Sequence, residues 1–304
     1  MMLTRAVPLH GVVAGVFWMV LTTFCFVGVT GIVRYLGSQV PAVEAAFLRY
    51  LAGALIMLPL MRGLLRRPPT ARAIRLHVLR GVLHGGAVML WFYAMARIPI
   101  AQVTALGYVS PIFVTIGAAL FLGERLYLRR IGAIIVGLMG ALVILRPGFQ
   151  EISLGQLAQL GAAPLFAASF LLAKGLTGHQ SDTTIVGMLS IFCTLTLLPG
   201  AVMNWQPPSA AELFWLTVTA ALATLGHFTM TRAFRAAPIT VTQPITILQL
   251  VWATILGIIA FGEPADPFVI LGGLMVVGAA SFISHREAVA ARRAITPPAQ
   301  ATKG

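Results

Sequence analysis

The chain has 304 residues, of which 59% are hydrophobic and only 10% are charged. A soluble globular domain carries about 25% charged residues, so this composition excludes an ordinary cytosolic enzyme, and the apolar excess excludes a disordered chain. The few charges are unbalanced, with 21 Lys and Arg residues against 8 Asp and Glu residues and a formal net charge of +13. In so apolar a chain this excess points first to the positive-inside rule of membrane proteins, and only then to nucleic acid.

Ten apolar segments approach the roughly 20 residues that a membrane-crossing helix needs. Pro, Gly and Arg clusters separate them, as at 66–69 and 146–148, and such residues mark helix ends. The apolar runs do not alternate with polar residues, which excludes the strands of a membrane β-barrel. The predicted spans cover residues 10–32, 41–61, 77–96, 100–121, 128–145, 154–173, 183–203, 211–231, 239–260 and 267–284.

The basic residues support this division into spans. With the N-terminus placed in the cytoplasm, 16 of them fall on the inner side, and only Arg34, Arg97 and Arg146 fall on the outer side. This asymmetry is what the positive-inside rule predicts for ten spans with both termini in the cytoplasm. Two arginines, Arg49 and Arg80, lie within or at the edge of a predicted helix, and the rule does not account for them.

The chain also repeats itself. Residues 96–124 are similar to residues 235–263 at an offset of 139, so that Glu124 at the end of one copy matches Glu263 at the end of the other. Each half contains five spans, an odd number, so the second half enters the membrane from the opposite side. The predicted fold is therefore an all-α integral membrane protein with ten transmembrane helices in two inverted-topology five-helix repeats. Such repeats place a substrate site at the midplane and favour a transporter over a channel, a membrane enzyme or a scaffold.

These features divide the chain into three parts. We expect a first repeat over residues 1–148, a second repeat over residues 149–287 and a disordered cytoplasmic tail over residues 288–304. The tail is rich in Ala, Arg and Pro and contains no apolar run.

Three segments carry a resemblance to a known family. They are RYLGSQVPAVEAAFLRY at 34–50, SPIFVTIGAALFLGERLYLRRIGAIIVGLMGALVILRPG at 110–148, and a weaker copy of the second at 244–287. The pattern resembles the EamA-type transporters of the drug/metabolite transporter superfamily, and the first segment is similar to the S-adenosylmethionine and riboflavin carriers of α-proteobacteria. The resemblance implies a bacterial inner-membrane protein with a central cavity lined by spans 1, 3, 4, 6, 8 and 9. Spans 2, 5, 7 and 10 would lie outside this ring.

No span has an Asp or Glu near its centre, so a proton relay through carboxylates is not expected. Facilitated diffusion, exchange, and coupling through histidine all stay open. The sequence also contains no metal-ligand cluster, no P-loop and no pair of nucleophile and base. We therefore expect neither a cofactor nor a resident metal, and an embedded enzyme is disfavoured.

Arg49 is the deepest fixed charge, about 12 Å into span 2 at 1.5 Å per residue. An arginine at mid-helix costs on the order of 3 kcal/mol on insertion scales and must find partners. It could bind a carboxylate or phosphate of the substrate, or it could pin the helix to backbone carbonyls of a neighbour. Because the resemblance places span 2 outside the cavity ring, the pin is favoured. Arg80, near the start of span 3, has the same two interpretations.

The candidate substrate-binding residues lie on the polar or aromatic stripes of the spans that would line the cavity. On span 3, Arg80, His84 and Trp91 share one face, and span 8 contributes His227. Either histidine could couple protons, although hydrogen bonding to a helix backbone is the commoner role. For the other residues, contacts between helices and core packing are the competing explanations. These other residues are Trp18, Thr22, Thr104, Tyr108, Ser169, Thr242, Thr246, Gln249 and Trp252.

The sequence thus predicts a secondary transporter that moves a small organic metabolite by alternating access. Export of an amino acid or related solute is the first expectation. The alternatives are uptake of S-adenosylmethionine or riboflavin, and a membrane scaffold that transports nothing. The expected partners are the small-molecule substrate and the lipid bilayer; nucleic acid is not expected, and a homodimer stays open.

Overall fold

The computed structural model describes residues 9–61, 69–122, 128–177, 180–237, 242 and 245–295. This part of the chain is helical between its turns and contains no β-strand beyond one isolated bridge between Pro147 and Gln150. The helices are α1 (Leu9–Leu36), α2 (Ala42–Met57) with the 3-10 turn η1 (Leu58–Met61), α4 (Ala71–Met95), α5 (Ile100–Gly107), α6 (Ser110–Leu122), α7 (Leu128–Leu145), α8 (Leu154–Thr177), α9 (Asp182–Met203), α10 (Ala210–Ala236), α12 (Ile247–Phe261) and α13 (Pro267–Ile295).

Every predicted span coincides over most of its described residues with one or two helices. Seven helical segments of the described chain are long and apolar enough to cross a membrane. Three shorter apolar helices fall in the ranges predicted for spans 5, 9 and 10, namely Ile131–Leu145, Ile247–Phe261 and Pro267–Ile283. The all-helical, multi-pass architecture is therefore confirmed, whereas the count of ten crossings stays a prediction.

Three helix boundaries differ from the predicted ones. The third span starts at Ala71 and not at 77, because the Thr70 side chain caps the helix by accepting a hydrogen bond from the backbone N–H of Ala73. The fourth span is broken between α5 and α6. The last helix continues to Ile295 and so occupies part of the range predicted as a disordered tail, while residues 296–304 lie outside the described residues.

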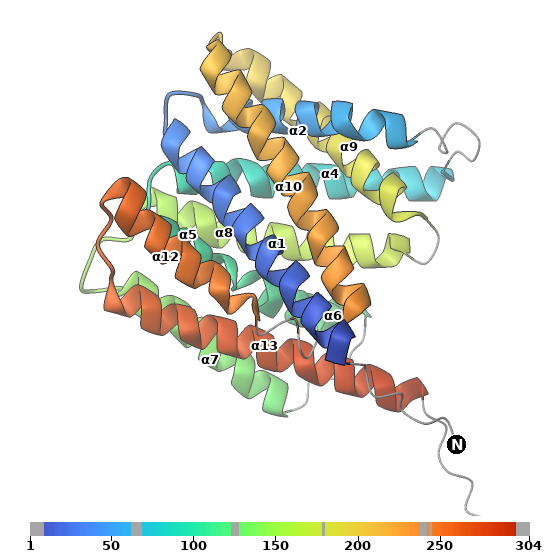
Figure 1. The fold of residues 1–304 in the computed structure, drawn as a ribbon, viewed down its shortest axis with the longest axis vertical. Helices are drawn as coiled ribbons and strands as arrows, with labels where there is room; N and C mark the ends of the chain where they lie inside the picture. Colours follow the sequence, from blue (N-terminus) through green and yellow to red (C-terminus); the bar gives the residue numbers. More distant parts are fainter. Residues whose placement is uncertain are drawn as a thin grey trace, which may run out of the picture.

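The helices form two end pairs and a layered middle (Figure 1). Helices α2 and α9 pack together at one edge of the bundle, and α7 and α13 at the opposite edge. Between these pairs, α1, α10 and α12 cross in front of α4, α5 and α8. Gly140 and Gly272 allow the close approach of α7 and α13, since a Cβ on either glycine would lie within 3 Å of the other glycine's carbonyl oxygen.

The contacts between helices repeat when the two halves are exchanged. In the repeat, α1, α2, α4, α5–α6 and α7 of the first half match α8, α9, α10, α12 and α13 of the second half. Helix α1 packs on α10 and its counterpart α8 packs on α4; likewise α6 packs on α8 and α12 on α1. The two edge pairs, α2 with α9 and α7 with α13, each join a helix to its own counterpart. This pattern is what a pseudo-twofold axis between inverted repeats produces.

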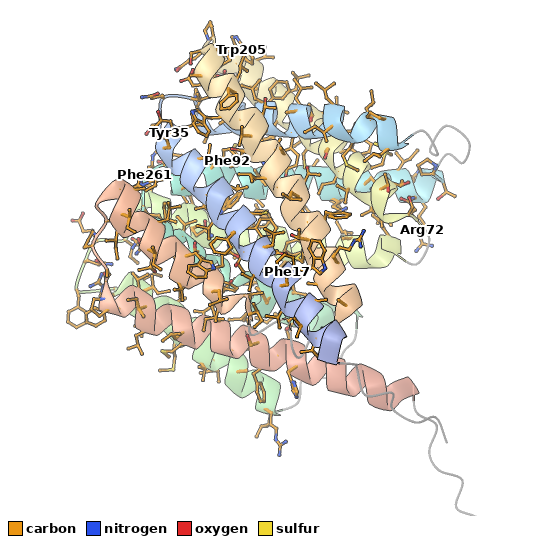
Figure 2. All side chains as sticks on the ribbon, in the orientation of Figure 1. Phe17, Tyr35, Arg72, Phe92, Trp205 and Phe261 are labelled. Atoms are coloured by element: carbon orange, nitrogen blue, oxygen red, sulfur yellow. The ribbon has the colours of Figure 1, made fainter. Side chains whose placement is uncertain are left out.

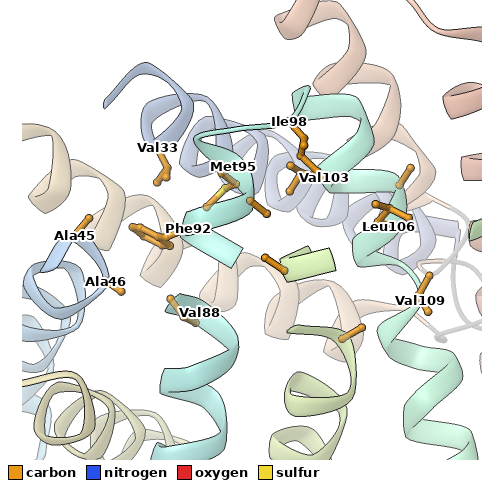
Figure 3. Packing of buried hydrophobic residues seen from close by; sticks show 14 of the residues in the cluster. Val33, Ala45, Ala46, Val88, Phe92, Met95, Ile98, Val103, Leu106 and Val109 are labelled. Atoms are coloured by element: carbon orange, nitrogen blue, oxygen red, sulfur yellow. The ribbon is translucent and has the colours of Figure 1, made fainter. Parts of the chain in front are cut away.

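The largest cluster of buried apolar side chains joins the halves. It contains Val33 of α1, Phe92 of α4 and Leu106 of α5, together with residues of the second half such as Cys193 and Leu250. Figure 3 shows the part of this cluster that gathers around Phe92 from α1, α2, α4 and α5. Figure 2 shows Tyr35 and Phe261 toward one end of the bundle and Arg72 toward the opposite end.

The ion pairs that join the halves in the described residues lie at the end where Tyr35 and Phe261 are found. Arg34 forms an ion pair with Glu263, with both Nε and Nη2 2.9 Å from Oε1, and the second carboxylate oxygen of Glu263 accepts the N–H of Ile100 at 2.8 Å. Arg146 forms an ion pair with Asp266. We call this end, defined by Arg34, Arg146, Glu263 and Asp266, the ion-pair end; it is the side that the positive-inside rule predicts to face outward.

Candidate functional site

Two arginines and two histidines come together inside the bundle. Arg49 lies on α2, Arg80 and His84 on α4, and His227 on α10. His84 lies within electrostatic range of the other three, and His227 within range of both arginines. Counted from the end opposite the ion-pair end, they lie roughly nine to thirteen residues along their helices, or about 14–20 Å at 1.5 Å per residue. We call Arg49, Arg80, His84 and His227 the basic group.

One nitrogen of Arg80 donates a hydrogen bond to a neighbouring helix. Because α4 begins at Ala71, Arg80 lies deeper than the predicted start of span 3 implied, and it is only 6% exposed. Its Nη1 donates to the carbonyl oxygen of Ile185 on α9 at 3.1 Å, whereas its buried Nε has no hydrogen-bond partner. The hydrogen bond to the α9 backbone therefore uses Nη1 of this guanidinium and leaves Nε without a partner.

Arg49 lacks the backbone partners that a pin would require. Its Nε and Nη1 are buried and have no hydrogen-bond partner, and its Cζ lies 4.6 Å from the ring centroid of Tyr50, its neighbour in sequence. Glu44 of the same helix is turned elsewhere, because its Oε2 accepts the backbone N–H of Gln206 at 3.0 Å. Arg49 lies within electrostatic range of His84 and His227, while the prediction that span 2 lies outside a cavity ring stays a prediction.

His84 joins span 3 to span 6. Its Nδ1 and the Oγ of Ser169, a fully buried residue of α8, share a hydrogen bond of 2.9 Å. Two aromatic rings approach it edge-on, Phe166 at 5.0 Å and Tyr50 at 6.1 Å between ring centroids. The contact between His84 and Ser169 brings together two of the predicted residues from different halves.

His227 lies on the side of the group formed by α10. Its side chain is exposed, and its ring meets Phe26 of α1 edge-on at 5.3 Å. His227 is thus the member of the basic group with the most exposed side chain, and it lies within electrostatic range of Arg49 and Arg80.

Aromatic side chains flank the basic group on α4 and α8. Phe166 and Phe170 stack with their centroids 6.1 Å apart and their planes at 15°, and Trp91 lies edge-on to Phe166 at 6.4 Å. Among the predicted residues Trp91 belongs to this cluster, whereas sequence reasoning did not select Tyr50 and Phe170. The helical spacing of Phe166, Ser169 and Phe170 is a signal that could have selected Phe170.

The middles of spans 4 and 9 meet at a hydrogen bond. The hydroxyl of Tyr108 donates to the carbonyl oxygen of Thr246 at 2.6 Å. Tyr108 ends α5 and precedes α6, and Thr246 precedes α12, so each residue lies where its helix is interrupted or begins. Interrupted helices that meet near mid-span are a common element of carrier binding sites.

Several predicted residues hold helices together. The hydroxyl of Thr22 donates to the carbonyl oxygen of Trp18 and shares a hydrogen bond of 2.8 Å with the hydroxyl of Thr229 on α10. Thr104 donates to the carbonyl oxygen of Ile100 at 2.9 Å. These contacts match the alternative role of contacts within and between helices.

The residues predicted on span 9 have different surroundings in the structure. Thr242 is fully buried, and Gln249 is half-buried on α12. Trp252 stacks on Phe24 of α1 at 4.8 Å, and its buried Nε1 has no hydrogen-bond partner. Pro244, which lies between Thr242 and Gln249 in the predicted span 9, is outside the described residues. Trp252 therefore packs at the α1–α12 contact.

Two pockets lie apart from the basic group, and none of the predicted residues lines them. One has a volume of about 250 Å³ and is lined by Pro41, Ala42, Val43, Met89, Leu90, Tyr93 and Asn204. The other, of about 190 Å³, lies at the ion-pair end and is lined by residues that include Gln102, Arg146, Gln150, Gln156 and Asp266. In the described residues no three His, Cys, Asp or Glu side chains are placed to hold a metal ion.

Comparison with known proteins gives a consistent family. The model of the EamA-like transporter family matches residues 13–146 and again residues 153–285. A riboflavin transporter of Vibrio cholerae is 29% identical, covering 93% of this chain and 97% of its own. An S-adenosylmethionine uptake transporter of Rickettsia bellii is 26% identical, covering 84% and 87%. A pseudopaline exporter of Pseudomonas aeruginosa is 28% identical, covering 90% and 96%.

Proposed function

Because the chain belongs to the EamA-like transporter family, we propose that it is a secondary transporter of the bacterial inner membrane that exports a small organic metabolite by alternating access. An amino acid or a related solute is the first candidate substrate. The family and the similar proteins are transporters and not enzymes, which supports the general activity, whereas solute and direction are part of the proposal.

The observation that carries this proposal is the exchange symmetry of the helix contacts. Most of the main contacts between the halves have a counterpart, and the interrupted span 4 meets the start of α12 through Tyr108 and Thr246. Two halves related in this way can rock against each other about a site that both contribute to, which opens the site to one side at a time. The ion pairs at the ion-pair end would then join the halves when that side is closed.

Uptake of riboflavin or S-adenosylmethionine is the second candidate. Similar proteins carry both names, and their similarity extends over most of the chain. The pseudopaline exporter has a comparable sequence identity of 28%, so sequence similarity alone does not indicate the direction of transport. The alternative from a different functional class is a membrane scaffold, which would have the same fold and show no flux of any solute.

Reconstitution tests the proposal directly. Purified protein in liposomes is offered a library of amino acids, riboflavin, S-adenosylmethionine and related metabolites, with and without a pH gradient, against liposomes without protein. We expect protein-dependent flux of at least one solute. Absence of flux for the whole library, with correctly inserted and monodisperse protein, would favour the scaffold. Flux that ignores the pH gradient while exchange is fast would exclude coupling through His84 or His227.

Direction and alternating access need two further measurements. Cells that express the protein should accumulate less of the identified solute if it exports and more if it imports. For alternating access, a variant without Cys25 and Cys193 receives a single cysteine through His227→Cys. The solute should change the labelling of this cysteine by impermeant reagents in opposite directions from the two sides; parallel changes would contradict alternating access.

A further inference from the structure

We propose that the basic group binds an anionic group of the transported solute, a carboxylate or a phosphate, while Phe166, Phe170 and Trp91 receive a flat ring of the same molecule. This inference rests on the proposed transport function and adds the chemical class of the substrate to it.

The first argument is the missing counter-charge. Arg49 Nε and Nη1 and Arg80 Nε are buried without hydrogen-bond partners, and Arg80 is 6% exposed. The ion pairs of the described residues, Arg34 with Glu263 and Arg146 with Asp266, lie at the ion-pair end and involve neither of these arginines. A buried cation without partners is expensive, and guanidinium is charged at any physiological pH. An anionic solute would satisfy these nitrogens and supply the counter-charge that the two arginines lack among the described residues.

The second argument is the geometry of the donors. A guanidinium has N–H groups that point in several directions, and each can donate to an oxygen of a carboxylate or a phosphate. Arg49 has unpartnered N–H groups on Nε and Nη1, which point to different sides of its guanidinium, and Arg80 adds an unpartnered Nε from the neighbouring helix. The backbone contact of Arg80 with Ile185 holds that side chain in place before the solute arrives. The site is thus partly preorganised for an anion.

The third argument is what lies beside the donors. His84 connects the basic group to Phe166, whose ring stacks with that of Phe170 and meets that of Trp91. Phe170 is 45% exposed, so the fold leaves part of this aromatic surface uncovered by other side chains of the described residues. A ring attached to the anionic group would pack against this surface, because aromatic side chains contribute apolar contact area with defined geometry.

The test uses pairs of probes that differ in charge and share a ring. Benzoate is compared with benzamide for the carboxylate, and flavin mononucleotide with riboflavin for the phosphate. Binding to the full-length protein in lipid nanodiscs is measured by calorimetry and by the shift of the unfolding temperature, neither of which depends on transport. We expect the anion of at least one pair to bind tenfold or more tightly than its neutral partner, and the pair that responds distinguishes carboxylate from phosphate.

Variants assign the preference to the basic group. Arg49→Gln should lower the affinity for the anion about tenfold and leave that for the neutral partner within twofold, and Arg49→Lys should retain part of the preference. Arg80→Lys is the second variant, because Arg80→Gln also removes the contact with Ile185. Arg97→Gln is the matched control, since exposed Arg97 lies over the ring of Tyr93, away from the basic group.

The outcomes separate this inference from the proposed function. Equal binding of charged and neutral probes, no binding of any probe, or an anion preference that survives Arg49→Gln would each overturn the inference. Flux of neutral solutes without anion preference would preserve the transporter and reject the anion site. Anion binding that depends on Arg49, together with no flux of any solute, would preserve the site and reject the transporter.

Discussion

Arginines at the ion-pair end and arginines in the basic group have opposite surroundings. Arg34 and Arg146 each contact a carboxylate from the other half of the chain, whereas Arg49 and Arg80 have unpartnered nitrogens and form no ion pair with a carboxylate of the described residues. The ion-pair end therefore has balanced charge and joins the halves, and the basic group has unbalanced charge between them. The comparison teaches that a charge paired within the fold stabilises the structure, while an unpaired charge deep in the bundle indicates a ligand that binds reversibly.

The largest expected effect on stability comes from Glu263→Gln. This substitution leaves Arg34 without its counter-ion and weakens the acceptor for the N–H of Ile100, and the Glu263 side chain is only 8% exposed. We expect a loss of about 3 kcal/mol of unfolding free energy, the range for breaking a largely buried ion pair. Denaturant titration of the detergent-solubilised protein measures it, with exposed Glu151→Gln as the control. A loss equal to that of the control would show that the ion pair is not structural.

Substitution in the basic group should change the unfolding free energy in the opposite direction. Arg49→Met removes a cation that has no counter-ion and keeps an unbranched apolar side chain. We expect the unfolding free energy to stay unchanged or to rise by about 1–2 kcal/mol, because unpaired charge at depth destabilises a membrane helix. The same titration without added solute measures it. A clear loss of stability would instead support the pin interpretation of Arg49.

Asp266→Asn should have a smaller effect than Glu263→Gln. Arg146 and Asp266 are both 27% exposed, and the new amide oxygen can still accept the N–H of Phe268 that Asp266 accepts. We expect a loss of about 1 kcal/mol that shrinks in high salt, as for solvent-screened pairs. A double-mutant cycle with Arg146→Gln isolates the contribution of the pair. A coupling as large as that between Arg34 and Glu263 would remove the ranking of the two ion pairs.

Ser169→Ala should have the smallest effect on stability. It removes the hydrogen bond to His84 Nδ1, and hydrogen bonds between membrane helices contribute about 0.6 kcal/mol on average. The consequence for function should be larger than for stability, because the His84 ring loses the contact that orients it toward the basic group. Binding of the preferred anionic probe measures this second effect. Ser190→Ala on α9 is the matched control, because its hydroxyl donates within its own helix.

The sequence predicted the helical fold through features that act locally. The length of the apolar segments and the Pro and Gly residues between them marked the spans. The repeat around Glu124 and Glu263 indicated two related halves. The start of α4 was missed by six residues, although Thr70 is a recognisable helix cap. The break at Tyr108 was not predicted either, because Pro111 marks a weakened helix without specifying where the chain turns.

The partners of the charged residues could not be predicted in the same way. Arg34 and Glu263 are 229 positions apart, and only the packing of α1 against α12 brings them together. Arg49 was judged from the expected position of span 2, whereas its surroundings depend on α4 and α10. The candidate site residues remain predictions about function, and the structure adds which of them are neighbours.

The two carboxylates of the ion-pair end have a consequence for biosynthesis. Glu263 and Asp266 lie in the short connection between α12 and α13, close to the end of the chain, while Arg34 and Arg146 belong to the half that is synthesised first. Until the ribosome has passed this connection, both arginines lack their counter-ions. The arrangement of the first half at this end is therefore completed only after the connection between α12 and α13 has been synthesised.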